Sequence, residues 1–160
     1  MRSSPLAALL AIPALGACVD TSPDRVKLVA EVWNVRLAVQ AGALVTSLSG
    51  TFDLVLQVGD LASDATIADP PSNQLVVAED QSSLLTLDAL PSSVSFPLTL
   101  SSGEKRTLAF TLTDANTLGA ADITRLCAGP SQIAVTFTDS LKGGKPTLAE
   151  SAAVTPSGCP

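Results

Sequence analysis

Apolar and polar residues alternate with a period of two along most of the chain after residue 25. The longest run covers residues 44–58, in which one phase is almost entirely apolar and the other is mostly polar. The apolar phase contains Leu44, Leu48, Phe52, Leu54, Leu56 and Val58. Because successive side chains of a strand point to opposite faces, this pattern predicts a half-buried strand of an antiparallel sheet. Gly50 lies inside the run, and we expect it to bend or divide the strand.

A change of phase divides the first alternating run, residues 26–39. The apolar positions are Val26, Leu28, Ala30 and Val32 before the change, and Trp33, Val35, Leu37 and Val39 after it. A one-residue slip inside a strand predicts a β-bulge or a change of strand partner. On this interpretation Trp33 faces the core.

The four phenylalanines also share phases with aliphatic neighbours, which predicts that they are buried. They are Phe52, Phe96, Phe110 and Phe137. With Trp33 in the core as well, no aromatic ring would remain at the surface to stack on a sugar. The sequence therefore argues against carbohydrate binding.

Shorter alternating runs, separated by turn residues, predict further strands. They cover residues 74–78, 84–90, 94–100, 108–112, 133–137 and 147–154. Pro97 cannot donate a ladder hydrogen bond, so we place its run at a sheet edge. Short, regularly spaced strands of this kind are typical of an all-β sandwich.

One segment, residues 116–129, has a helical period instead. Ile123, Leu126 and Cys127 fall on one helix face at i, i+3 and i+4. Asn116 or Thr117 can cap the start of this helix, and the Gly-Pro pair at 129–130 ends it.

The sequence PLTLSSGEKRTLAFTLTD at residues 97–114 is similar to the paired strands of bacterial immunoglobulin-like domains of the CARDB and fibronectin-like kinds. The resemblance implies an immunoglobulin-like antiparallel β-sandwich, with the helix as a crossover between its E and F strands. An up-and-down β-barrel is the structural alternative.

The first 18 residues have the parts of an export signal. A short basic start with Arg2 precedes an apolar run at residues 5–15. This run is too short to cross a bilayer, which takes about 20 apolar residues. Its ending, Leu15-Gly16-Ala17-Cys18, resembles the lipobox of bacterial lipoproteins. The resemblance implies a diacylglycerol on the thiol of Cys18, cleavage before it and acylation of the new amino terminus; the alternative is an ordinary structural cysteine.

This interpretation divides the chain into three parts: a signal peptide at 1–17, a lipidated N-terminus and tether at 18–25, and a β-sandwich domain at 26–160. The formal net charge is -6, and removal of Arg2 with the leader would make it -7. An acidic domain is a poor ligand for nucleic acid and for anionic lipid, so the acyl chains would supply the membrane affinity. We expect the cell envelope as the location, specifically the outer membrane of a Gram-negative bacterium.

Cys127 and Cys159 remain if Cys18 carries lipid. An even pair of cysteines in an exported domain predicts a disulfide, and this one would hold down the C-terminal end of the chain. The chain has no histidine and no Cys-x-x-Cys pair, so a zinc site is not expected.

Catalytic motifs are scarce in this sequence. Without histidine there is no Ser-His or Cys-His pair. The Ser102-x-x-Lys105 string lies in a predicted turn, whereas the penicillin-recognising enzymes hold that string on a helix. Loop carboxylates occur as the pairs Glu79 with Asp80 and Asp60 with Asp64, and as Asp114 near Asn116, none with the spacing of an EF-hand calcium loop.

We therefore expect a non-catalytic envelope lipoprotein without a cofactor. It would act as a structural or protein-interaction module, with the membrane and another envelope protein as its partners. The alternative function is a small barrel that binds an apolar ligand in its interior.

Overall fold

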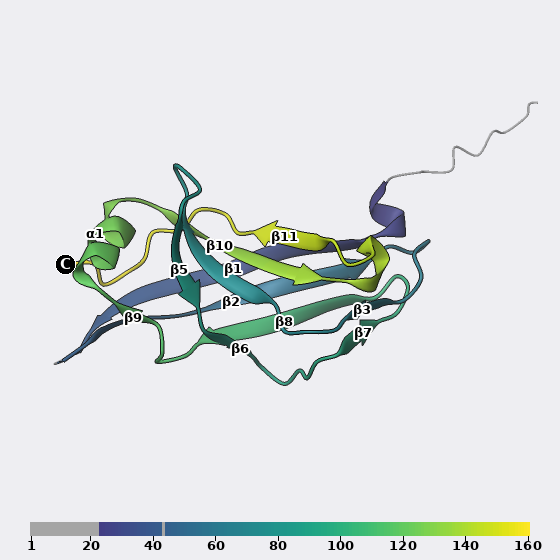
Figure 1. Cartoon of the computed structure of the whole chain (residues 1–160), viewed down its shortest axis with the longest axis horizontal. Helices are drawn as coiled ribbons and strands as arrows, with labels where there is room; N and C mark the ends of the chain where they lie inside the picture. The colour runs from purple at the N-terminus through teal and green to yellow at the C-terminus, as the bar shows by residue number, and fades with distance from the viewer. Residues whose placement is uncertain (1–22, 43) are drawn as a thin grey trace, which may run out of the picture.

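The computed structural model describes residues 23–42 and 44–160 and shows a mainly β chain with one short α-helix (Figure 1). The strands are β1 Leu28–Ala41, β2 Thr46–Val58, β3 Ala65–Ile67, β4 Ser72–Val77, β5 Ser83–Leu87, β6 Ala89–Pro91, β7 Leu98–Leu100, β8 Lys105–Leu112, β9 Thr117–Leu118, β10 Ser131–Thr138 and β11 Pro146–Glu150. The helices are η1 Pro23–Val26, α1 Ala120–Ala128 and η2 Ser140–Lys142, of which η1 and η2 are 3-10 helices.

Two open antiparallel sheets contain most of the strands. Sheet 1 has the order β1-β2-β8-β6, with β9 paired to part of β2, and sheet 2 has the order β11-β10-β4-β5. β3 and β7 form a small third sheet. Because β2 pairs with β8 and β4 pairs with β10, the chain crosses between sheets and does not run up and down between neighbours. The all-β prediction is confirmed, and the up-and-down barrel is wrong.

The core lies between the two sheets and contains the apolar phases of their strands. Phe52 and Phe110 are direct cross-strand partners, and their rings stack with centroids 4.9 Å apart. Leu75 and Ile133 contribute from sheet 2 and are fully buried. The prediction for the phenylalanines is confirmed, with Phe96 half-buried against the core and the other three buried.

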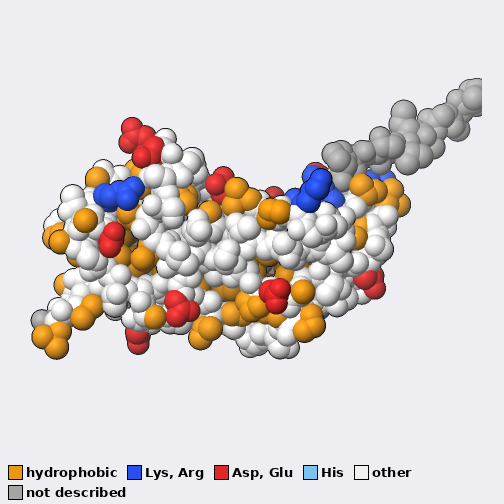
Figure 2. All heavy atoms as spheres, viewed as in Figure 1, with side chains coloured by type: hydrophobic (Ala, Val, Ile, Leu, Met, Phe, Trp, Pro, Cys, Tyr) orange, Lys and Arg blue, Asp and Glu red, His pale blue; other side chains and the backbone are white. Residues whose placement is uncertain are grey.

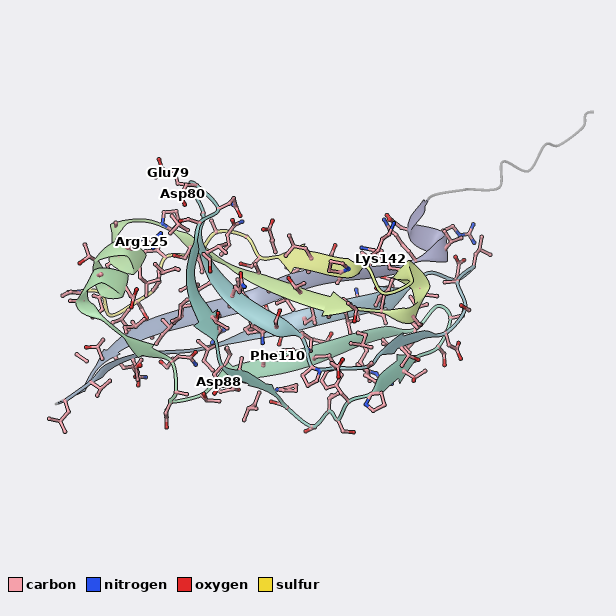
Figure 3. The ribbon with its side chains drawn as sticks, in the orientation of Figure 1. Glu79, Asp80, Asp88, Phe110, Arg125 and Lys142 are labelled. Atoms are coloured by element: carbon pink, nitrogen blue, oxygen red, sulfur yellow. A yellow bond between two sulfur atoms is a disulfide. The ribbon has the colours of Figure 1, made fainter. Side chains whose placement is uncertain are left out.

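Asn116 is buried beside the segment that connects β5 of sheet 2 to β6 of sheet 1. Its side-chain oxygen accepts a hydrogen bond from the Asp88 amide at 2.8 Å, and its side-chain nitrogen donates to the Asp88 carbonyl at 2.7 Å. Asp88 is marked at this crossing in Figure 3. The prediction that Asn116 or Thr117 caps the helix is wrong, because the residue before the helix is Gly119. Residues 117 and 118 first pair with β2, so the helix begins only at Ala120.

Two local expectations about β2 and β7 had different outcomes. β2 continues through Gly50 without division, and Gly50 pairs with Leu37 of β1. A Cβ atom at Gly50 would lie 2.2 Å from the Arg36 carbonyl oxygen, so glycine permits a close strand approach here. Pro97 immediately precedes β7, which pairs only with β3 and is therefore an edge strand, as predicted.

The first described residues and the C-terminus lie at opposite ends of the long axis of the domain (Figure 1). At the entry, η1 occupies the end of the expected tether, and the Arg25 carbonyl accepts a hydrogen bond from the Leu61 amide at 2.9 Å. The β1–β2 hairpin tip, α1 and the C-terminus lie at the opposite end. Figure 2 shows hydrophobic atoms at this hairpin tip, where Leu44 is 96% exposed and Val45 is 53% exposed.

Candidate interaction surface

A β-bulge in β1 determines which face of sheet 1 carries Trp33. Trp33 pairs with Asp53 and Arg36 pairs with Thr51, so two residues of β1 lie opposite Phe52 alone. One of them, Asn34, has a positive φ of 54°. The predicted phase change is confirmed as a bulge, but it falls after Trp33 and not before it.

Trp33 consequently points away from the core and is 56% exposed, so the prediction that it is buried is wrong. The prediction against carbohydrate binding, which required every aromatic ring to be buried, fails with it. Before the bulge the core phase is Leu28, Ala30 and Val32, which places Trp33 on the outer phase with Glu31. The indole nitrogen of Trp33 donates a hydrogen bond to Glu31 Oε2 at 2.9 Å. The charge of Glu31, two residues before Trp33, is the sequence signal that could have placed the ring outside.

Trp33 borders a hollow of about 420 Å³ on the outer face of sheet 1. The hollow is lined by Glu31, Trp33, Asn34, Asp53, Val55, Lys105 and Thr107. Asn34 and Asp53 are joined across it by a hydrogen bond of 2.7 Å from the amide nitrogen to a carboxylate oxygen. Donors and acceptors therefore surround an exposed aromatic ring.

A second hollow, of about 340 Å³, follows on the same face beyond the bulge. Its lining includes Arg36, Ser49, Thr51, Thr111 and Ser157. The two hollows border successive rungs of the β1–β2 ladder, Trp33–Asp53 and Arg36–Thr51. We call this surface, made of both hollows, the Trp33 face.

Cys127 and Cys159 form the predicted disulfide, with Cα atoms 5.7 Å apart. The bond joins the last turn of α1 to the C-terminal segment. That segment runs along the free edge of β1, where Ser157 accepts a hydrogen bond from the Val39 amide at 2.8 Å and donates one to the Leu37 carbonyl at 3.0 Å. Cys18, the predicted lipidation site, lies outside the described residues.

The Ser102-x-x-Lys105 string does not form a nucleophile with a base. The Ser102 hydroxyl donates to the Asp60 carbonyl at 3.2 Å, and Lys105 lines the hollow on the outer face of sheet 1. The neighbouring Glu104 accepts a hydrogen bond from the Ser101 amide at 2.8 Å, and this bond, followed by the Arg106 guanidinium, lowers the pKa of Glu104.

The loop carboxylates are held in turns and ion pairs. The Arg25 guanidinium, which donates to Asp60 Oδ1 at 2.8 Å, holds the pKa of Asp60 below its ordinary value of 3.8. Hydrogen bonds that the hydroxyl and the amide of Ser82 donate to Asp80 Oδ1 lower the pKa of Asp80. Figure 3 shows Glu79 and Asp80 at the tip of the β4–β5 hairpin, with Arg125 of α1 beneath.

Asp64 Oδ1 accepts a hydrogen bond from the Ser102 amide at 3.0 Å. Among residues 23–42 and 44–160, no group of three or more metal-ligating side chains converges. The same part of the chain contains no helix with the length and apolar character needed to span a membrane.

Comparison of the chain with protein-family models, with characterised proteins and with solved structures gave no match.

Proposed function

We propose that this chain is an exported, lipid-anchored immunoglobulin-like domain that acts without catalysis as a protein-interaction module on the cell envelope. The observation that carries the proposal is the Cys127–Cys159 disulfide in a chain whose first 18 residues have the parts of a lipoprotein signal. Structural disulfides persist in oxidising compartments outside the cytosol, so the bond and the leader support the same location.

The strand order supports the immunoglobulin-like type. In that fold one sheet has strands A, B, E and D and the other has C, F and G. Sheet 1 has this order if β1, β2, β8 and β6 are A, B, E and D, and sheet 2 has it if β4, β10 and β11 are C, F and G. The helix α1 then lies between the E and F strands, as the resemblance implied.

Anchoring through Cys18 would place the entry end of the domain, at η1, next to the membrane. The β1–β2 hairpin tip would then point away from it, because the two lie at opposite ends (Figure 1). Leu44 and Val45 at that tip expose apolar surface to a partner. The outer edge of β5, which ends sheet 2, offers a second place for a partner strand to pair.

Metabolic labelling with radioactive palmitate tests the anchor. Wild type and the control variant Leu148→Ala, which changes an exposed side chain, should both carry label and sediment with membranes, and Cys18→Ser should do neither. Equal labelling of all three proteins, or of none, would show that Cys18 is not the attachment point.

The interaction role is tested with a photo-crosslinking amino acid at position 44 of the anchored protein, and at the exposed position 148 of sheet 2 as a control. We expect one defined adduct from position 44 that disappears in a Cys18→Ser background. The absence of an adduct at 44, or identical adducts at both positions, would contradict a partner at the hairpin tip.

The alternative of a barrel enclosing an apolar ligand finds no support, because the sheets are open and the interior is filled by side chains of both.

A further inference from the structure

We propose that the Trp33 face binds an uncharged polysaccharide, with the indole ring of Trp33 as its stacking platform. This activity goes beyond the envelope role proposed above and does not require the lipid anchor, because every residue that lines the two hollows lies after the first 18 residues.

Trp33 is the only tryptophan of the chain, and its side chain would gain free energy by burial, yet the bulge directs it outward and leaves it 56% exposed. The hydrogen bond from its nitrogen to Glu31 satisfies the polar edge of the indole and fixes the orientation of the ring. An apolar ring held in place at the surface loses little conformational freedom when a ligand stacks on it.

The polar residues around the ring suit hydroxyl groups. Glu31 and Asp53 supply carboxylate acceptors, Lys105 supplies a donor, and Asn34 and Thr107 supply groups that can do both. A small number of placed polar groups beside an apolar surface is typical of sites that bind small molecules, and the volume of about 420 Å³ is within their usual size.

The charges indicate a neutral ligand. Glu31 and Asp53 contribute two negative charges to the face, and Lys105 and Arg36 contribute two positive ones. A polycation would meet both basic side chains, and a polyanion would meet both carboxylates, so neither finds a complementary surface. An uncharged chain of sugars can hydrogen-bond to these side chains and needs no excess of either charge opposite it.

The length of the face indicates an oligomeric ligand. Along β2 the two hollows extend from Val55 to Ser49, which is six residue-to-residue steps or about 20 Å of strand. The second hollow is lined by hydroxyl-bearing side chains such as Ser49, Thr51 and Thr111 together with apolar ones, Leu37, Ala38 and Leu112. A single sugar would fill only part of this surface.

The test uses the purified full-length chain in detergent and a panel of soluble neutral polysaccharides: hydroxyethyl cellulose, laminarin, xylan, galactomannan and amylopectin. Because the chain has one tryptophan and no tyrosine, its intrinsic fluorescence reports on Trp33 alone. We expect at least one polysaccharide to produce a saturable change in emission and to retard the protein in affinity electrophoresis.

Three variants of the Trp33 face and one control on sheet 2 locate the binding site. Trp33→Ala should weaken retardation at least tenfold, and Trp33→Phe, which keeps a ring, should weaken it less. Lys105→Ala retains the fluorophore and should weaken the emission titration several-fold. Leu148→Ala, which removes an apolar side chain that is 58% exposed on sheet 2, is the matched control and should bind as wild type does.

The proposal fails if no polysaccharide of the panel changes the emission or retards the protein, or if Trp33→Ala binds as tightly as wild type. It also fails if the protein responds only to poly-lysine or only to alginate, because the face would then recognise charge.

Discussion

Loss of the Cys127–Cys159 disulfide should cost this domain a large part of its stability. The bond closes a loop of 32 residues between the end of α1 and the next-to-last residue of the chain. In the unfolded chain a crosslink of that span removes roughly 12 cal/mol/K of conformational entropy, which is about 3–4 kcal/mol at 25 °C. Both cysteines are half-buried, so replacement by serine removes little packing in addition.

Urea unfolding followed by circular dichroism measures this cost in the variant Cys127→Ser/Cys159→Ser. We expect the free energy of unfolding to fall by about 3–4 kcal/mol and the Tm by roughly 7–15 °C for a chain of this size. Each single variant should lose as much as the double variant, because either substitution opens the same loop. Wild type in reducing agent is the control, and its unfolding midpoint in urea should equal that of the double variant.

Hydrogen exchange gives a local measurement of the same change. The Ser157 amide, which donates to the Leu37 carbonyl, should exchange faster once the C-terminal segment is released from α1. A stability loss below about 1 kcal/mol, or single-variant losses that add up in the double variant, would refute the loop-closure reasoning.

Two other substitutions test local features of the fold. Gly50→Ala should destabilise the domain by about 1–3 kcal/mol in thermal unfolding, because its Cβ would meet the Arg36 carbonyl oxygen in the β1 bulge. The control Gly129→Ala has nothing within 4 Å and should change stability little, so equal losses in both variants would contradict the close-approach argument. Asp60→Asn should lower the Tm at pH 7 and should lower it by less at pH 2. Arg25 lowers the pKa of Asp60, so the ionised carboxylate stabilises the fold above its ordinary pKa of 3.8 and this contribution is lost as pH falls through the lowered value. A Tm difference that stays constant from pH 7 to pH 2 would exclude the ion pair as its cause.

The alternation of side chains determined the class of fold and most of the core, because a strand must bury one face whatever its partners are. Phe52 and Phe110 could be assigned to the interior in this way, and the helix around Leu126 followed from its different period. The disulfide was predicted from the even pair of cysteines that is left if Cys18 carries lipid. These inferences need only the local pattern of the chain.

The pairing of distant strands decided the rest. The bulge lies between Trp33 and Arg36 because β1 must keep register with β2 on both sides of Phe52, and a shift of one residue moves a side chain to the opposite face. That shift brought Trp33 to the surface beside Asp53 and Lys105, which are far from it in sequence. Asn116 is buried for a similar reason. Its side chain bonds to the backbone of Asp88, which lies between β5 and β6 and is distant in sequence. Sequence periodicity fixed which residues alternate, and only the register between strands fixed which face each side chain occupies.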